Sequence, residues 1–358
     1  MLEKIFIDKD ISLAQTMPSF FYLKSEYYDL SLEKIFKNSW QFITDVNSLK
    51  SKIYPFTLLN HSLNEPLILT KRNDDLLCLS NVCPHRGSLL CVNETNSRNI
   101  RCQYHGRVFD LEGRMLSAPG FNKVENFPSK NDNLARIPLK QWKKFIFISL
   151  NPKFNISEII KDINDRLGWY PFDQLNFDKS ASNEYVIDAH WSLYCENYLE
   201  GFHVSFVHKG LNDDIELDTY KTKTLENGVL QYTLSKTKKD ALKIPNGFLN
   251  SNEDIYAYYY WIFPNIMLNF YNWGISVNII EPINKEKTKI RFLSYPINGK
   301  KQPSNSGASL DKVEKEDQDI VLSVQKGIKS KFYNRGRYSS QHEIGVHHFH
   351  RLICKAIN

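Results

Sequence analysis

The chain has 358 residues, of which 42% are hydrophobic and 24% are charged, a composition typical of a globular protein with about two domains. Its net charge of +6 comes from Lys and Arg dispersed among Asp and Glu, which argues against a nucleic-acid-binding surface. The N-terminal segment lacks the apolar core of a signal peptide, and no run approaches the roughly 18 apolar residues of a membrane span. We therefore expect a cytoplasmic protein with no membrane partner, whose six cysteines serve as metal ligands or buried thiols.

The predicted elements begin with a helical segment and continue with strands. Residues 26–45 have apolar positions at helical spacing, and we expect residues 1–40 to form a helical arm that packs on the C-terminal domain. From about residue 50 the sequence favours short strands bounded by Asn, Asp, Gly or Pro, so residues 41–150 predict a small all-β domain. The predicted strands are 65–72, 76–82, 107–111 and 143–150.

The remaining residues, 151–358, predict a domain of mixed composition. Helical patterns cover 156–167 and the region near 311–330, and strand-like patterns cover 215–300. Residues 191–208 favour an interrupted helix. The predicted fold class is therefore α+β, with an all-β domain followed by a domain that combines a curved sheet with a long helix.

Two mixed pairs of Cys and His give the strongest chemical signal. Cys83 and His85 are separated by one residue, Cys102 and His105 by two, and sixteen residues lie between the pairs. In a Rieske centre, one iron is held by two Cys thiolates and the other by two His imidazoles. The pattern predicts a Rieske [2Fe–2S] cluster. The alternative is a structural zinc site, although zinc fingers usually pair Cys with Cys and His with His.

A glycine follows each pair: Gly87 follows the first and Gly106 the second. Glycine suits these positions, because the backbone there must approach a cluster closely. The remaining cysteines are expected to be small buried hydrophobic residues. They are Cys78, Cys91, Cys195 and Cys354.

A second set of candidate metal ligands lies in the second domain. His203 and His208 are five residues apart, and Glu200 precedes His203 by three. Mononuclear Fe(II) that activates O2 is typically held by two His and one carboxylate. On a regular helix the two imidazoles would point about 140° apart, so the helix must widen or break between them.

Both sets resemble the ring-hydroxylating oxygenase α-subunit family. The segment CPHRG followed by C-x-YHG is similar to the family's Rieske motif, with Gln103 and Arg107 where Pro and Trp are frequent. SAPGF, residues 117–121, is similar to the loop that covers the cluster in the family. The resemblance implies an all-β Rieske domain and a START-like helix-grip catalytic domain with an antiparallel sheet and a long helix.

The resemblance also implies roles for residues of the motif N-x-x-E-x-x-H-x4-H. His203 and His208 would be iron ligands, and Asn197 would lie near the iron. Glu200 would be the acid that links an iron-ligand His to a Rieske His of a neighbouring subunit. Phe202 stands where Tyr is frequent in the family.

The third iron ligand must be a carboxylate from a distant segment. Residues 313–327 resemble the family segment that supplies it, with Asp317 as the first choice and Asp319 as the second. Glu314 and Glu316 are expected only to place negative charge at the start of a helix.

The C-terminal segments are most similar to the branch that contains choline monooxygenase and glycine-betaine or carnitine oxygenases. A quaternary ammonium substrate could then be held by cation–π contacts, and an aromatic ring or aromatic carboxylate is the alternative. The candidate aromatic residues are Tyr258, Tyr260, Phe263, Phe270, Tyr271 and Trp273. The cluster of His347, His348 and His350 favours a surface or interface role over a second metal site.

The expected function is that of a terminal oxygenase with one [2Fe–2S] cluster and one Fe(2+) per chain. It would use O2 and electrons from a separate NAD(P)H-dependent reductase to hydroxylate or demethylate a small organic substrate. The family resemblance implies a homotrimer, with electron transfer between subunits. An aromatic ring-hydroxylating oxygenase and a Rieske electron carrier without a second iron are the alternatives.

Overall fold

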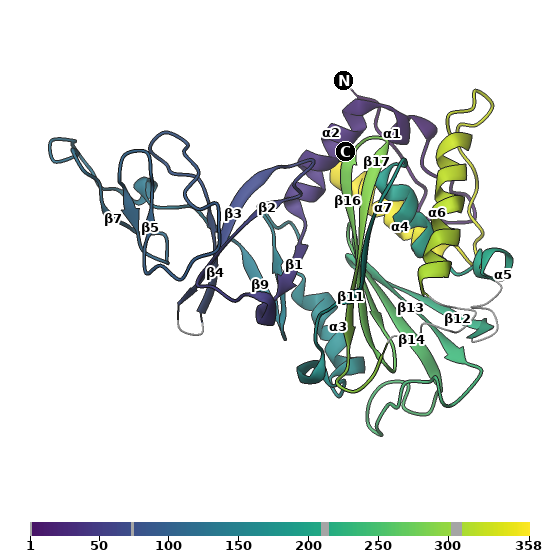
Figure 1. Cartoon of the computed structure of the whole chain (residues 1–358). Helices are drawn as coiled ribbons and strands as arrows, with labels where there is room; N and C mark the ends of the chain where they lie inside the picture. Colours follow the sequence, from purple (N-terminus) through teal and green to yellow (C-terminus); the bar gives the residue numbers. More distant parts are fainter. Residues whose placement is uncertain (1, 73–74, 209–214, 302–309) are drawn as a thin grey trace. The chain divides into compact units, whose positions relative to one another are not determined.

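The computed structural model describes residues 2–72, 75–208, 215–301 and 310–358, with the side chains of the last range from Lys312 onward. The chain divides into two compact units, which are described separately (Figure 1). One unit is Trp40–Pro152, and the other joins Met1–Ser39 to Lys153–Asn358. No helix within the described ranges is both long and apolar enough to span a membrane.

The unit Trp40–Pro152 contains three small antiparallel sheets, with strand orders β1-β10-β9, β2-β3-β4-β8 and β5-β6-β7. Two buried cysteines, Cys83 and Cys102, belong to the same hydrophobic core as Ile68, Leu79 and Phe109. The strands are β1 Gln41–Asp45, β2 Ile53–Leu58, β3 Glu65–Arg72, β4 Asp75–Ser80, β5 Ile100–Arg101, β6 Val108–Phe109, β7 Met115–Ser117, β8 Arg136–Ile137, β9 Leu139–Trp142 and β10 Phe145–Ile148.

The larger unit is built on a seven-stranded antiparallel sheet in the order β11-β17-β16-β15-β14-β13-β12. From β12 to β17 each strand pairs with the next one along the chain, and β11 closes the far edge by pairing with β17. The strands are β11 Asp178–Ile187, β12 Ile215–Leu225, β13 Gly228–Ser235, β14 Ile255–Ile262, β15 Ile266–Phe270, β16 Gly274–Asn284 and β17 Lys287–Pro296.

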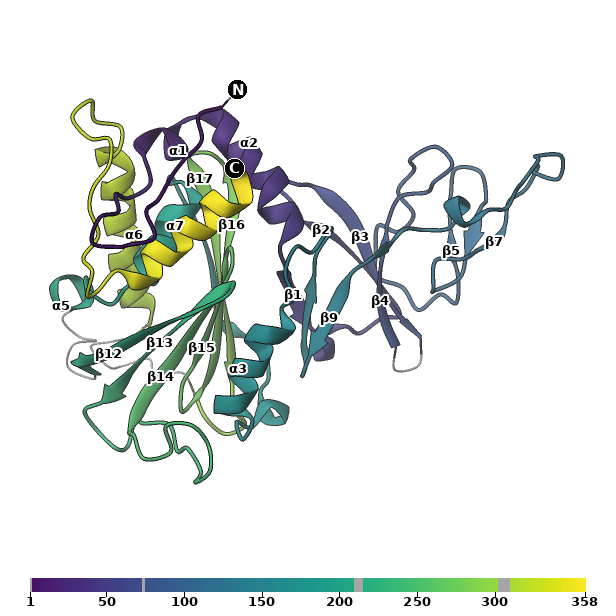
Figure 2. The ribbon, with the colours of Figure 1, turned by 180° about the vertical axis from the view of Figure 1, so that it is seen from behind.

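Helices cover both faces of this sheet. On β14, the Tyr260 hydroxyl donates to the Asp162 carbonyl of α3, 3.4 Å away, whereas the adjacent Trp261 ring packs 5.0 Å from Phe349 of α7. Neighbouring strand residues point to opposite faces, so α3 and α7 lie on opposite sides of the sheet, and both views place α4 and α6 with α7 (Figures 1 and 2). The helices are α1 Ser19–Leu23, α2 Ser25–Lys34, α3 Ser157–Leu167, α4 Trp191–Tyr198, α5 Val204–Val207, α6 Leu310–Gly327 and α7 Ile344–Ile357.

One predicted helix is wrong in its second half. A helix was predicted over 26–45, but α2 ends at Lys34 and residues 41–45 form strand β1. Phe42 packs 5.7 Å from Phe147 of β10, so strand pairing in the smaller unit prevails over the local helical spacing.

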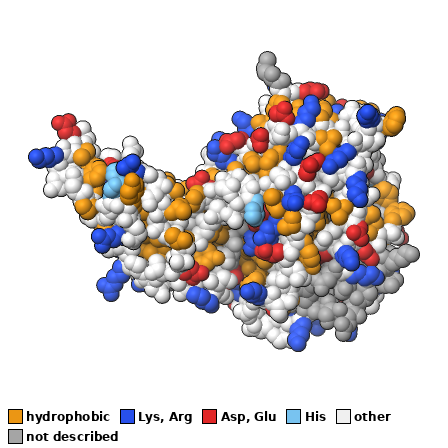
Figure 3. Space-filling view, turned by 45° about the horizontal axis from the view of Figure 1, so that its top comes forward, with side chains coloured by type: hydrophobic (Ala, Val, Ile, Leu, Met, Phe, Trp, Pro, Cys, Tyr) orange, Lys and Arg blue, Asp and Glu red, His pale blue; other side chains and the backbone are white. Residues whose placement is uncertain are grey.

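Charged side chains of both signs lie intermixed over the described part of the face that Figure 3 shows. This distribution agrees with the dispersed Lys, Arg, Asp and Glu of the sequence.

Candidate metal centres and active site

The two Cys/His segments of the smaller unit fold into matching tight turns. The Gly87 amide donates to the Cys83 carbonyl, and the Gly106 amide donates to the Cys102 carbonyl, each at 3.0 Å. Both glycines have positive φ, +70° and +74°, a conformation that side chains strongly disfavour. The turns therefore place each Cys and the His that follows it on the same side of a short loop.

The candidate ligand atoms of these turns converge, and the imidazole nitrogens among them lack hydrogen-bond partners within the described residues. The rings of His85 and His105 lie 4.7 Å apart, and both Nδ1 atoms are buried without a hydrogen-bond partner among the described residues. The thiols of Cys83 and Cys102 are within hydrogen-bonding distance of each other. Two buried imidazole nitrogens without partners beside two neighbouring sulfurs fit a Rieske cluster, since a buried polar atom is costly without a partner.

Backbone amides also point at the sulfur of Cys102. Burial raises the pKa of this thiol, but hydrogen bonds from the amides of Tyr104 and His105 reverse the effect, and the pKa is lowered overall. Donors of this kind favour a thiolate ligand. The loop 117–121 lies next to the same turns, with the Phe121 ring 5.2 Å from that of His85.

A buried cation stands beside this site. Arg107 is 3% exposed, its guanidinium lies 4.5 Å from the Phe121 ring centre, and it is 3.6 Å from the carboxylate of Asp132. Burial lowers the pKa of His85, and the charge of Arg107 lowers it further, which places that charge within electrostatic reach of the cluster site.

We predict that Arg107→Gln makes the midpoint potential of the cluster more negative by roughly 60 mV, equivalent to about 1.4 kcal/mol for a one-electron couple. The buried positive charge stabilises the reduced, more negative cluster. A reductive titration followed by electron paramagnetic resonance measures the change. Arg86→Gln is the control, because Arg86 is the smallest of the causes that lower the pKa of His85, and its exposed charge is screened by water. Equal shifts in the two variants would contradict the prediction.

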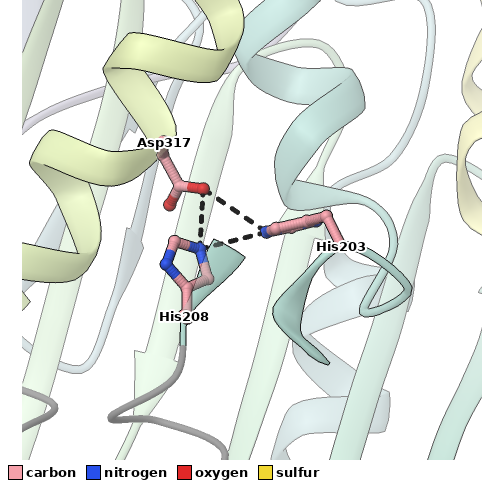
Figure 4. A group of neighbouring side chains, drawn as sticks. All are labelled: His203, His208 and Asp317. Carbon is pink, nitrogen blue, oxygen red and sulfur yellow. Dashed lines mark hydrogen bonds and ion pairs between the residues drawn. The ribbon is translucent and has the colours of Figure 1, made fainter. Parts of the chain in front are cut away.

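Three side chains form the candidate iron site of the larger unit (Figure 4). The Nε2 atoms of His203 and His208 lie 3.2 Å apart. Asp317 Oδ1 lies 2.9 Å from His208 Nε2 and 3.3 Å from His203 Nε2. One ligand atom from each residue lies within 4.8 Å of the others, and two His with one carboxylate suit a mononuclear Fe(II). Asp319, the second choice for the third ligand, is exposed and outside this group.

The helix is interrupted before His203 and not between the two histidines, so the break predicted from their spacing is misplaced: the short helix α5 fills the interval, and His208 follows its end with a non-helical backbone. Helix α4 ends at Tyr198, and the short helix α5 starts at Val204, after His203. Gly201 lies in the break, where an added Cβ would come within 2.7 Å of the Tyr220 ring. Only glycine fits this close approach, so Gly201 allows the broken segment to pack against β12.

Carboxylates fix the far side of both imidazoles. His203 Nδ1 donates to Glu200 Oε1 at 2.6 Å, and His208 Nδ1 donates to Glu316 Oε2 at 2.8 Å. A proton held on Nδ1 leaves the Nε2 lone pair free for a metal. The expectation that Glu316 only places charge at a helix start is therefore wrong, because Glu316 contacts His208. Sequence spacing could not show this contact, since the two residues are far apart in the chain.

Hydrogen bonds between the candidate ligands shift their pKa values. Burial alone would lower the pKa of His203, but hydrogen bonds to Asp317 and Glu200 raise it to about 9. Burial would raise the pKa of Asp317, but its hydrogen bonds with the two imidazoles lower it. At neutral pH a protonated His203 therefore lies beside an ionised Asp317, and a metal ion that binds there must displace the proton.

We predict that Glu316→Gln weakens iron binding by roughly 10- to 100-fold, the usual effect of losing a carboxylate behind a His ligand. Iron uptake by the apoprotein, measured against a competing chelator, tests this. Glu281→Gln, a change of the same kind on β16, is the control, because Glu281 pairs with Arg291 and is not among the residues that line the site. An unchanged iron affinity for Glu316→Gln would contradict the prediction.

A pocket of about 130 Å³ adjoins the three candidate iron ligands. It lies between the sheet and helices α4 and α6, and Asn197 and Glu200 are in its wall. The other lining residues from the sheet and α4 are aromatic or carry amides for the most part. They include Tyr194, Tyr198, Tyr220, Gln231, Tyr256, Tyr259, Asn269, Tyr271, Asn278 and Phe292.

Of the six aromatic residues predicted for the pocket, only Tyr271 is among the described residues that line it. Tyr258 and Tyr260 point to the opposite face, where their hydroxyls contact Asn250 and the Asp162 carbonyl. Strand alternation places Tyr259 in the pocket instead, so the prediction chose the wrong face of β14. The remaining three pack elsewhere: Phe263 against Trp261, Phe270 against Tyr170, and Trp273 behind Tyr271.

Tyr256 lines the pocket for a different reason. Thr233 pairs with Ala257 and Leu234 with Ile255, so Tyr256 is the extra residue of a β-bulge. Such bulges turn a side chain away from the regular alternation, and single-sequence reasoning does not detect them.

The histidines of α7 have internal structural contacts. His347 Nε2 lies 2.7 Å from the Asp8 carbonyl, His348 Nε2 lies 2.8 Å from the Leu225 carbonyl, and His350 Nδ1 lies 2.6 Å from the Tyr338 hydroxyl. His347 and His350 are buried. Of the expected surface or interface role, the surface alternative is therefore wrong for these two, because α7 packs its histidines inward.

Comparison with known proteins matches each of the two units to a known domain family. Residues 39–128 match the Rieske [2Fe-2S] domain, and residues 172–358 match the ring hydroxylating alpha subunit (catalytic domain). The chain is 30% identical to choline monooxygenase, chloroplastic, of Beta vulgaris, over 94% of this chain and 76% of that protein. It is 29% identical to the carnitine monooxygenase oxygenase subunit of Escherichia coli (strain K12), over 96% and 94%.

A solved structure shares the fold of the whole chain. The quaternary ammonium Rieske monooxygenase CntA, in complex with an inhibitor, superposes with a TM-score of 0.78 at 23% identity, covering 100% of each chain. The catalytic-domain match covers just over half of the chain, and the Rieske match covers most of the smaller unit. This chain therefore belongs to the ring-hydroxylating α-subunit family of Rieske non-haem iron oxygenases, and it is an oxidoreductase homologous to the oxygenase components of choline and carnitine monooxygenases.

Proposed function

We propose that this protein is the terminal oxygenase of a monooxygenase system that hydroxylates or demethylates a small quaternary ammonium compound. Electrons would come from NAD(P)H through a separate reductase. The observation that carries the substrate class is an aromatic corner in the pocket beside the candidate iron ligands. Tyr271 lies 5.9 Å from Tyr259 and 6.2 Å from Tyr256, with its ring at 79° and 84° to theirs.

Rings at right angles present more than one π-face to the same space, which suits a cation without N–H groups. Burial raises the pKa values of Tyr259 and Tyr271, so both phenols stay neutral at physiological pH. The pocket volume of about 130 Å³ is below the roughly 300–1,000 Å³ of pockets for drug-sized ligands, and this favours a small substrate over a fused aromatic ring.

The proposal assigns a role to each candidate ligand. Cys83, His85, Cys102 and His105 would hold the cluster. His203, His208 and Asp317 would hold the iron next to the pocket, with Asn197 in the pocket wall. When bound, the cluster supplies single electrons and the iron supplies O2 activation. The residues 1–40, 41–150 and 151–358 would then be the arm, the Rieske domain and the catalytic domain.

Glu200 and the surface near it support a homotrimer in which two subunits form one working site. Glu200 bonds His203 from the side opposite the candidate iron site, and the nearby Phe202 and Phe206 are exposed. Exposed aromatic side chains beside a functional carboxylate fit a subunit contact. Light scattering of the purified protein measures the assembly, and a monomer with full turnover would exclude it.

A screen of substrate-stimulated O2 uptake tests the proposed function. The full chain with both metals, a competent reductase and NADH is given choline, glycine betaine, carnitine or stachydrine, with naphthalene and benzoate as the aromatic alternatives. We expect at least one ammonium compound to increase O2 uptake with matching product. If all four fail while an aromatic compound succeeds, the quaternary ammonium assignment is wrong. About two iron atoms per chain instead of three would favour an electron carrier.

A further inference from the structure

Two buried asparagines stand in the wall of the pocket beside the candidate iron ligands. Asn269 on β15 and Asn278 on β16 both line this pocket, and they are only 3% and 8% exposed. Asn269 pairs with Ser276, which is two residues before Asn278 on the adjacent strand, so the two asparagines are diagonal neighbours on one face of the sheet. Such neighbours lie about 7–8 Å apart, close enough for both amides to reach one small ligand.

The amide oxygens of both asparagines are already occupied. Asn269 Oδ1 accepts from the Tyr198 hydroxyl at 2.6 Å, and Asn278 Oδ1 accepts from the Ser276 hydroxyl at 2.7 Å. Both distances match O–H···O bonds and lie at or below the short limit of N–H···O bonds. The oxygen of each amide therefore faces the hydroxyl, and each amino group faces away from it.

The two amino groups are donors without a protein acceptor. Among the described residues, none accepts a hydrogen bond from Nδ2 of Asn269 or of Asn278. A ligand that fills the pocket excludes water from these N–H groups, and a buried donor without an acceptor is costly. This part of the wall therefore favours a ligand with an oxygen acceptor over a ligand that places only apolar groups there.

The amide pair lies beside the aromatic corner of Tyr256, Tyr259 and Tyr271. Tyr259 is the direct cross-strand neighbour of Asn269 and points to the same face of the sheet. The Cβ atoms of such a pair are about 4.5–5.5 Å apart. A small ligand with its ammonium group on these rings therefore brings an oxygen that is only a few bonds away next to the amides.

We propose that Asn269 and Asn278 form a donor subsite that binds an oxygen of the substrate, and that this subsite selects ammonium compounds with a hydroxyl or carboxylate oxygen a few bonds from the nitrogen. This inference rests on the proposed function. It goes further by stating what the substrate must carry besides its cation and which two residues recognise it.

Equilibrium binding to the full chain, loaded with both metals and kept anaerobic, tests the inference. Isothermal titration calorimetry compares choline, glycine betaine and propyltrimethylammonium, which has the shape of choline with a methyl group in place of the hydroxyl. Choline offers a hydroxyl oxygen, glycine betaine a carboxylate, and propyltrimethylammonium no acceptor. We expect at least one of the oxygen-bearing compounds to bind about tenfold more tightly than propyltrimethylammonium, and the tighter of the two identifies the oxygen that the amides bind.

Two variants of the subsite separate its donors from the shape of the pocket. Asn278→Leu keeps the size of the side chain and removes its N–H groups. It should reduce the tenfold preference to about twofold, while the affinity for propyltrimethylammonium stays the same or rises. A pocket that was merely damaged would lose affinity for all three compounds. Asn269→Leu removes the other amide and should lower the same preference.

The matched control lies on the same strand as Asn278. Asn284→Leu makes the same change at an exposed position of β16 and should leave all three affinities unchanged. Iron content and circular dichroism establish that each variant is folded and loaded. If Asn278→Leu does not fold, Asn269→Leu decides the result.

The possible failures are distinguishable. If propyltrimethylammonium binds as tightly as both oxygen-bearing compounds, or if the folded subsite variants keep the wild-type preference, the inference is wrong and the proposed function stands. If no ammonium compound binds or stimulates O2 uptake, both are wrong.

Discussion

Replacing Asp317 by alanine is expected to empty the mononuclear iron site and reduce substrate turnover to background. Asp317 is the only carboxylate within the described metal group, and its Oδ1 atom contacts both candidate His ligands. Two imidazoles alone bind Fe(II) weakly, because the carboxylate provides the negative charge and the third ligand. The iron content should fall from about three to about two atoms per chain, while the cluster's visible spectrum stays unchanged.

The control for this change lies two residues further along the same helix. Asp319→Ala removes a carboxylate from an exposed position and should retain the full iron content and turnover. A folded Asp317→Ala protein that kept its mononuclear iron would contradict the assignment. If both variants kept their iron and their turnover, the third ligand would come from another residue.

The part of the site that sequence reasoning predicted best is local. Cys83 and His85 lie in one tight turn, and Cys102 and His105 in another, so the spacing itself determines how each pair presents its atoms. The interruption of the helix within 191–208 was also predicted, but its position was wrong, because the break lies before His203 and not between His203 and His208.

Long-range contacts were much harder to predict. Asp317 lies 109 residues from His208, and only the resemblance to the family singled out its segment. Glu316 and Glu314 looked like ordinary acids at a helix start, since the sequence does not show which side of α6 faces the histidines or the pocket. The aromatic prediction failed because an error of one residue on a strand reverses the face, as Tyr259 and Tyr260 demonstrate.

Replacing Glu200 by glutamine is expected to leave both metal sites filled and yet slow turnover by roughly 100-fold. Glutamine can still accept the hydrogen bond from His203 Nδ1, now 2.6 Å long, so the imidazole keeps its orientation. The negative charge is lost, and with it the proposed link between this imidazole and a Rieske His of a neighbouring subunit. The other oxygen of Glu200 accepts from the amides of Phe202 and His203, and these two contacts are lost in the variant, because the NH2 group of glutamine only donates.

Stopped-flow measurement of cluster re-oxidation separates electron transfer from the other steps. Reduced protein with bound substrate is mixed with O2, and the recovery of the oxidised cluster spectrum is followed. We expect a slow phase in Glu200→Gln, while iron content and the dissociation constant for substrate match the wild-type values. Re-oxidation at the wild-type rate would remove Glu200 from the electron path.

Glu316→Gln is the matched control for Glu200→Gln, because each carboxylate accepts from the Nδ1 atom of one candidate iron ligand. At saturating iron, Glu316→Gln should re-oxidise its cluster at nearly the wild-type rate, since its proposed role is only to orient His208.

A second experiment asks whether the link joins different subunits. Cys102→Ser, without a cluster, and Asp317→Ala, without the mononuclear iron, should each be inactive alone. Mixed assemblies should regain turnover, because an intact cluster of one subunit can then serve the intact iron site of its neighbour. If mixed assemblies form and stay inactive, electron transfer takes place within one chain, and Glu200 has a local role at His203.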